Sequence, residues 1–138
     1  MLDNGTALPA MLFPDVPTYY RDFTPHNYNR TFDGAVPANR VVERSLNVPS
    51  VRMLDKYGRE NFLALVRALG FGTINRSAGH YGLSLILGGA EISLWDLTSA
   101  YMKMAANLTG RQTIRTPHYD PGGGTEVDAG DIPLSRGA

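Results

Sequence analysis

The amino-acid sequence predicts a mainly helical fold class, and three observations support this prediction. Apolar residues recur at helical spacing in several segments between residues 37 and 110. Glycines follow these segments directly, at the position where helices commonly end. Prolines interrupt the first 36 residues so often that no long helix can form there. We therefore expect an extended, aromatic- and proline-rich segment (1–36), a helical core (37–110) and a flexible tail rich in glycine and proline (111–138).

Composition excludes several classes of protein. The chain has 138 residues, 43% of them hydrophobic, which is enough for one core. Its 13 basic and 13 acidic residues cancel, so no long-range field would attract nucleic acid or an anionic bilayer. The lack of cysteine excludes disulfides and thiolate zinc sites but leaves the compartment open. No stretch approaches the roughly 20 apolar residues of a membrane span, and the beginning carries no export signal.

The first residues and the extended segment suggest a piece of a larger body. Leu2–Gly5 reads like the last turn of a helix whose main part is missing, which favours an excised fragment. Large aromatic side chains bury much apolar area, so we expect those of the extended segment to anchor it against something larger. They are Phe13, Tyr19, Tyr20, Phe23, Tyr28 and Phe32.

Two helices are predicted on either side of residue 45. Pro37 suits a first turn and opens a short helix that ends near Arg44. Asn47 is a favourable N-cap residue, and a second helix should follow it from Val48 to Tyr57, where a glycine stops it.

Further helices complete the predicted core. A third amphipathic helix fits residues 60–69, and residues 72–79 read as a loop. The apolar run 83–87 is too short to assign by periodicity, and between a buried strand and a helical turn we favour the helix. Ser93, with Asp96 three residues later, forms a weaker capping box that opens a helix to about residue 108. Its inward residues should be Leu94, Leu97, Tyr101, Met104 and Leu108.

The sequence Ser45-Leu46-Asn47 is the candidate site. A hydroxyl and a carboxamide two residues apart, on a turn where a helix starts, can both point into one cleft. Taken alone, the two residues are explained more simply as helix caps. The surrounding sequence therefore has to decide between the two interpretations.

Four segments in a fixed order resemble the class A, bifunctional penicillin-binding proteins, and within them the 1C group most. The segments are 15–18, 28–34, 44–51 and 81–97, and the resemblance extends over residues 1–108. It implies an α/β (α+β) transpeptidase fold of the penicillin-binding protein and β-lactamase type, with a five-stranded sheet flanked by helices. The chain would be the central helical part of such a domain, without most of the sheet.

The resemblance also implies roles for both residues of the candidate site. Ser45 matches the serine of the family's Ser-x-Asn motif, which relays a proton between the general base and the leaving amine. Asn47 matches the asparagine that binds the stem-peptide amide and helps to orient the catalytic lysine. The family's other two motifs are missing, because no Ser-x-x-Lys and no Lys-Thr-Gly occurs in the chain. We expect that the isolated chain forms no acyl-enzyme.

By the same resemblance, the intact protein would bind peptidoglycan stem peptides ending in D-Ala-D-Ala, and also β-lactams. It would act on the periplasmic, extracytoplasmic face of the bacterial inner membrane. No cofactor is implied. The three histidines share no ligand spacing, so we expect no metal site. The triple glycine at 122–124 lacks the helix opening and the lysine of a phosphate-binding loop.

Two alternatives remain open from the sequence. The chain could be a non-catalytic helical interaction module in which Ser45 and Asn47 act only as caps, or a cell-wall-binding domain that keeps the fold without the chemistry. If the chain is instead the transpeptidase fragment, we expect exposed apolar faces where the missing sheet would dock, and hence marginal solubility or self-association.

Overall fold

The computed structural model describes residues 1, 5–110, 113–115 and 126–128 of the chain. These residues form two compact units, which we describe separately. The first unit combines Met1–Phe62 with Arg76–Ala90, and the second combines Leu63–Asn75 with Glu91–Ala138. The predicted helix end at 2–5 involves residues 2–4, which lie outside the described part of the chain.

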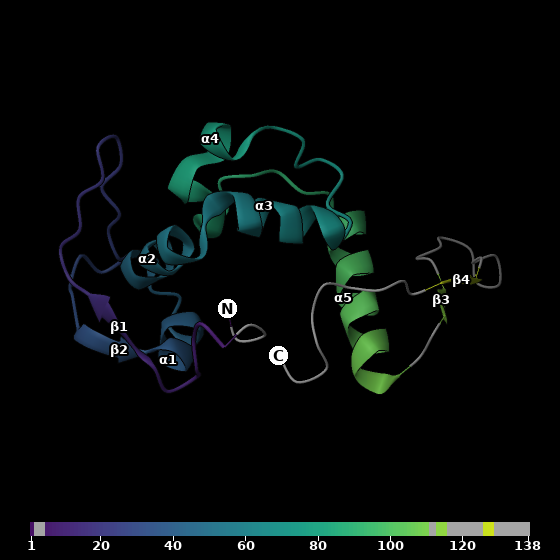
Figure 1. Cartoon of the computed structure of the whole chain (residues 1–138), viewed down its shortest axis with the longest axis horizontal. Coiled ribbons are helices and arrows are strands. Elements are labelled where there is room, and N and C mark those ends of the chain that lie inside the picture. Colours follow the sequence, from purple (N-terminus) through teal and green to yellow (C-terminus); the bar gives the residue numbers. More distant parts are fainter. Residues whose placement is uncertain (2–4, 111–112, 116–125, 129–138) are drawn as a thin grey trace. The chain divides into compact units, whose positions relative to one another are not determined.

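An antiparallel strand pair and a short helix form one end of the first unit (Figure 1). Strand β1 (Leu12–Asp15) pairs with β2 (Gly34–Pro37), and helix α1 (Ala38–Glu43) follows β2 directly. A buried apolar cluster joins them, which consists of Ala7, Phe13, Val36, Ala38, Val41 and Leu46. The described residues of segment 1–36 form no helix, and the pairing of residues 12–15 with residues 34–37 did not follow from the sequence.

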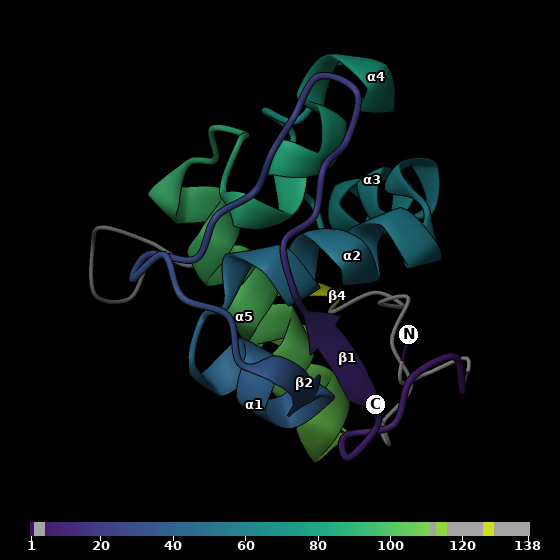
Figure 2. The same ribbon diagram turned by 90° about the vertical axis from the view of Figure 1, so that its left-hand side faces the viewer.

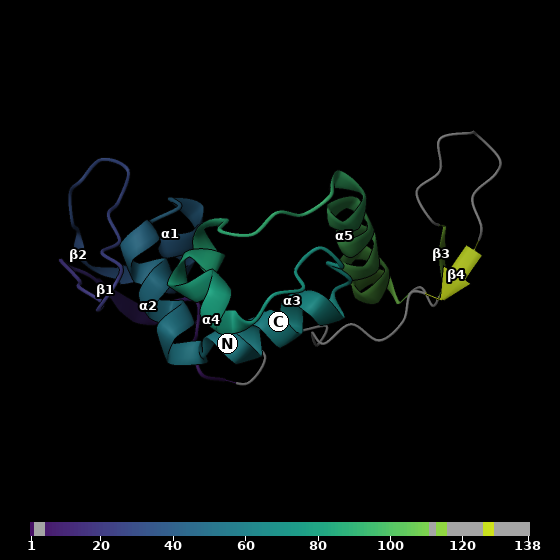
Figure 3. The same cartoon turned by 90° about the horizontal axis from the view of Figure 1, so that it is seen from above.

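Helix α2 (Asn47–Tyr57) contacts β1 and the 3₁₀ helix η1 (Gly82–Leu87). Its buried residues Val48, Val51 and Leu54 recur at the spacing of one helix face, as the sequence predicts. The 3₁₀ helix η1 packs against α2, and the single-turn helix α4 (Ala78–Tyr81) leads directly into η1 (Figure 3). The helical preference for 83–87 is therefore confirmed, although the turn is 3₁₀ and not α.

The long loop between β1 and β2 runs past α2 to α4 (Figure 2). Of the six aromatic side chains expected to anchor the extended segment, Phe13 is buried in β1, and Tyr20 and Phe23 are half-buried. The other three, Tyr19, Tyr28 and Phe32, are exposed and anchor nothing within the described residues. Polar side chains hold this loop in place instead, as the site described below shows.

Helix α3 (Arg59–Ala68) begins in the first unit and continues into the second, and the helix predicted at 60–69 is confirmed. In the second unit, α5 (Leu94–Thr109) starts where the sequence predicts, because Ser93 Oγ accepts a hydrogen bond of 3.0 Å from the Asp96 amide. It ends at Gly110, which has a positive φ of 71°.

The inward face predicted for α5 is wrong in part. Ala100 and Ala106 are the buried residues of this helix, whereas Leu94, Tyr101 and Leu108 are exposed. These three apolar residues are spaced seven apart and so share one stripe of the helix. The sequence pattern identifies the apolar stripe correctly, but the described residues do not cover it.

Two short strands, β3 (Thr113–Arg115) and β4 (Glu126–Asp128), pair antiparallel within the segment predicted as a flexible tail. The other residues of 111–138, with the triple glycine, lie outside the described residues. Among the helices that the structure describes, none has the length and apolar character needed to cross a bilayer.

The contrast between α2 and α5 predicts different responses to the same substitution. Leu54 is 2% exposed and Leu108 is 66% exposed. Leu54→Ala should lower the free energy of unfolding by about 2–5 kcal/mol, the usual range for a buried leucine. Leu108→Ala should change it by less than about 0.5 kcal/mol. Urea denaturation of both variants measures this, and equal losses would mean that the α5 stripe is covered in solution.

Candidate functional site

Ser45 occupies the turn that ends α1 and leads into α2. Its amide donates to Val42 O at 3.1 Å, and the Leu46 amide donates to Val41 O at 3.0 Å. This pair of hydrogen bonds is the Schellman motif, and the usual apolar contact accompanies it, because Leu46 and Val41 belong to one buried cluster. The motif fixes the direction in which the chain leaves α1.

The backbone of Ser45 is strained in this turn. Its φ is 52°, in the left-handed region where the Schellman motif usually has glycine. A residue with a Cβ atom pays about 1–2 kcal/mol in that conformation. Residues held in such conformations occur often at functional sites, so the strain supports a functional interpretation of Ser45. As a C-terminal cap it would be a poor choice.

Asn47 is the first residue of α2 and not its N-cap, which corrects the prediction. Leu46 holds the N-cap position and makes no side-chain cap. The Asn47 side chain instead donates from Nδ2 to His26 O at 2.9 Å, which ties its amide group to the long loop. Asn47 is half-buried, and its carboxamide is held through Nδ2.

Asn27 caps α2 from a distance of 21 residues along the chain. Its Oδ1 accepts a hydrogen bond of 3.1 Å from the Val48 amide, one of the amides that has no partner within the helix. Its Nδ2 donates to Asp15 Oδ1 at 2.8 Å and to Thr31 O at 2.9 Å. The second carboxylate oxygen of Asp15 accepts from the Asp33 amide at 2.9 Å.

Burial makes this network strong. Asp15 is 0% exposed and Asn27 is 3% exposed. Every polar atom of a buried group that lacks a partner costs about 1–3 kcal/mol, so full pairing holds the loop firmly to the start of α2. An ion pair between Asp33 and Arg44 then extends the network to the residue before Ser45. Sequence reasoning missed Asn27, because nothing in its neighbourhood shows that its partners lie 12 and 21 residues away.

The arrangement leaves two polar atoms available. Within the described residues, neither Ser45 Oγ nor Asn47 Oδ1 has a hydrogen-bond partner. A hydroxyl can accept one proton and donate another, and an amide oxygen can accept from a peptide N–H. These are the kinds of atom that a proton relay and an amide-binding site require. No group of three potential metal ligands gathers anywhere in the residues that the structure describes.

Comparison with known proteins identifies similar chains of much greater length. Penicillin-binding protein 1C of Escherichia coli is 38% identical over 104 residues, which are 75% of this chain and 14% of that protein. Penicillin-binding protein 1F of Bacillus subtilis is 33% identical over 103 residues, 73% of this chain and 14% of that protein. Penicillin-binding protein 1B of Vibrio cholerae is 30% identical over 82 residues, 59% of this chain and 10% of that protein.

The chain thus spans about one seventh of the length of the first two relatives, since the shared part is 14% of each. No protein-family model matches it. The resemblance noted in the sequence is confirmed by these relatives, which all carry the same family name.

Strain at Ser45 predicts a substitution that stabilises the chain. Ser45→Gly should raise the free energy of unfolding by about 0.5–1 kcal/mol, because glycine adopts a positive φ without steric cost but gains entropy when unfolded. Ser45→Ala keeps the Cβ atom and should leave stability within about 0.5 kcal/mol of the original. Thermal unfolding followed by circular dichroism compares the two variants. An Ala variant as stable as the Gly variant would show that the positive φ at residue 45 is not unfavourable for a residue with a Cβ atom.

Proposed function

Because the chain belongs to the penicillin-binding protein family, we propose that it is the part of a peptidoglycan D,D-transpeptidase domain that carries the Ser-x-Asn motif. It acts within a longer polypeptide, which supplies the nucleophilic serine and its lysine. The chain itself has neither Ser-x-x-Lys nor Lys-Thr-Gly. In this proposal Ser45 serves the chemistry and Asn47 serves binding.

One observation supports this proposal most. Ser45 is kept in a conformation that glycine would adopt more cheaply, and its hydroxyl has no hydrogen bond within the described residues. Ser45 is solvent-exposed, so its hydroxyl is open to a substrate, and a residue chosen only for stability at this φ would be glycine. A serine that must offer its hydroxyl to a substrate explains both features.

The chemistry is acyl transfer in two steps. The serine of the longer protein attacks the carbonyl of the penultimate D-Ala of a stem peptide, and the terminal D-Ala leaves with a proton on its amine. An amine of a neighbouring stem peptide then attacks the acyl-enzyme, loses its proton and releases the serine. Ser45 Oγ passes the proton between the base and the leaving or entering amine. Such general acid–base help contributes about 100- to 10,000-fold in rate.

Asn47 is suited to hold the substrate. Its Nδ2 is already bonded to His26 O, so its orientation is set before substrate arrives. Its Oδ1 then accepts from an amide N–H of the stem peptide, and this contact helps to place the carbonyl near the nucleophile. β-Lactams occupy the same place as D-Ala-D-Ala in this proposal. The whole protein works at the periplasmic face of the inner membrane.

Substitution at Ser45 in the longer protein tests the assignment. Ser45→Ala should lower kcat for cross-linking by about 100- to 10,000-fold, because the proton relay is lost while the fold is kept. Ser50→Ala is the matched control, since its hydroxyl donates to Leu46 O at 2.6 Å and is not free for substrate. Release of D-Ala from a pentapeptide donor in the presence of an acceptor amine gives the rate.

Unchanged cross-linking by Ser45→Ala would reject the catalytic role and would favour a non-catalytic module. Covalent labelling of a residue within this chain by a fluorescent penicillin would also contradict the proposal. The proposal places the nucleophile elsewhere in the longer protein. Circular dichroism of each variant separates a loss of chemistry from a loss of fold.

A further inference from the structure

A cavity of about 480 Å³ lies in the first unit, apart from Ser45 and Asn47. Its wall comes from the long loop, the end of α2, the start of α3, and the α4–η1 segment. The lining residues include neither member of the Ser-x-Asn pair. The volume falls within the range of about 300–1,000 Å³ that is typical of small-molecule sites.

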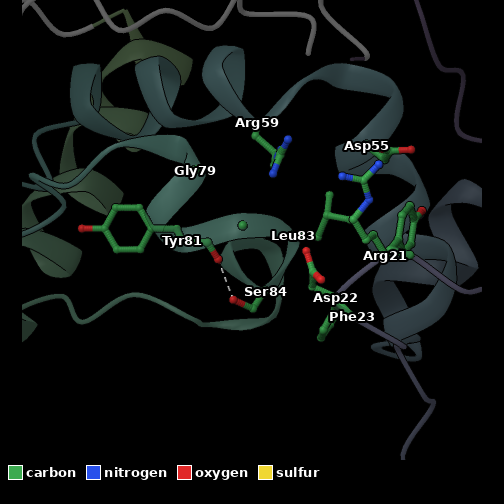
Figure 4. A pocket seen from close by; sticks show the side chains of 11 residues that line it. Arg21, Asp22, Phe23, Asp55, Arg59, Gly79, Tyr81, Leu83 and Ser84 are labelled. Carbon is green, nitrogen blue, oxygen red and sulfur yellow. Dashed lines mark hydrogen bonds between the residues drawn. The ribbon is translucent and has the colours of Figure 1, made fainter.

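Four charged side chains line this cavity, two of each sign. Arg21 and Asp22 lie at the tip of a tight turn that the paired residues Tyr20 and Phe23 close. Asp55 comes from the last turns of α2, and Arg59 is the first residue of α3. Figure 4 shows Arg59 and Asp22 directed toward one another from opposite sides of the opening.

None of these four groups is neutralised within the described residues. The ion pairs found there are Arg40–Glu43 and Arg44–Asp33, and neither involves a residue of the cavity. The four side chains also make no hydrogen bond in the described part of the chain. Two guanidinium groups and two carboxylates, all solvent-exposed, therefore line one opening without being paired to each other.

We propose that this cavity binds a small zwitterion, such as a free amino acid or a dipeptide, by its two charged ends. Arg21 and Arg59 take the carboxylate, for which the guanidinium fork is well shaped. Asp22 and Asp55 take the ammonium group. A ligand with charge of one sign only would meet two like charges in the wall, which selects against it.

The remaining lining residues suit this ligand. Leu83 and Phe23 supply apolar surface for a short side chain. Burial, with the negative charge of Asp55, raises the pKa of the Tyr20 phenol. A phenol is protonated at neutral pH even without this shift, so Tyr20 is a hydrogen-bond donor. Ser84 Oγ donates to Tyr81 O at 2.7 Å, which fixes the α4–η1 wall of the cavity.

Titration of the 138-residue chain with L-alanyl-L-alanine tests the proposal, followed by two-dimensional NMR. Two derivatives serve as probes of each end: N-acetylation removes the ammonium group, and C-amidation removes the carboxylate. We expect saturable shifts at the amides that line the cavity. Each derivative should bind at least about tenfold more weakly, the change that corresponds to about 1.4 kcal/mol.

Charge-neutral variants identify the groups that act. Arg59→Gln should weaken binding of the dipeptide about tenfold. It should leave binding of the C-amide unchanged, because the C-amide has no carboxylate for Arg59 to bind. Asp22→Asn should likewise weaken binding of the dipeptide about tenfold. It should leave binding of the N-acetyl derivative unchanged, because that derivative has no ammonium group. Arg40→Gln and Glu60→Gln are the controls, since both residues are exposed and outside the cavity.

Several results would overturn the proposal. They are equal affinity for the dipeptide and its derivatives, equal loss in the control variants, and no saturable binding at millimolar concentration. A ligand that binds only the folded state also raises Tm. For a variant of lowered stability, the increase in Tm on adding the dipeptide therefore measures binding at the same cavity. The cavity contains no residue of the proposed transpeptidase site, so this test and the cross-linking test fail or succeed independently.

Discussion

The carboxamide of Asn27 is the interaction on which the rest of the first unit depends. It joins β1 through Asp15, the long loop through Thr31 O, and α2 through the Val48 amide. Each of its hydrogen bonds lies where water does not compete well, because the side chain is buried. These hydrogen bonds hold the loop between β1 and β2 to the start of α2. Together with the Schellman motif at Ser45, this side chain positions the turn that carries Ser45 and Asn47.

Placing the cap far away in the sequence has a consequence for the site. An asparagine at the start of a helix usually uses its side chain to cap that helix. Here Asn27 does the capping, so the Asn47 carboxamide is free to bond His26 O, and its Oδ1 has no partner within the described residues. The turn at Ser45 is strained, and the buried hydrogen bonds around it stabilise the fold enough to hold this conformation.

Local features of the fold could be predicted from the sequence, and features that depend on distant partners could not. The bounds of α2, α3 and α5 follow from apolar spacing, the Ser93 cap and the terminal glycines. The outward stripe of Leu94, Tyr101 and Leu108 could not be predicted, because periodicity identifies an apolar face but not what lies against it. The candidate site residues Ser45 and Asn47 follow from the resemblance, whereas the support that Asn27 gives them appears only once the chain is folded.

Hydrogen exchange at the Val48 amide tests this account most directly. Amides in the first turn of a helix lack an intrahelical partner and normally exchange quickly. If Asn27 Oδ1 caps Val48, this amide should be protected as strongly as those in the middle of α2, and Asn27→Ala should abolish the protection. Exchange of the Val48 amide at the rate of an unprotected amide in the original chain would contradict the account.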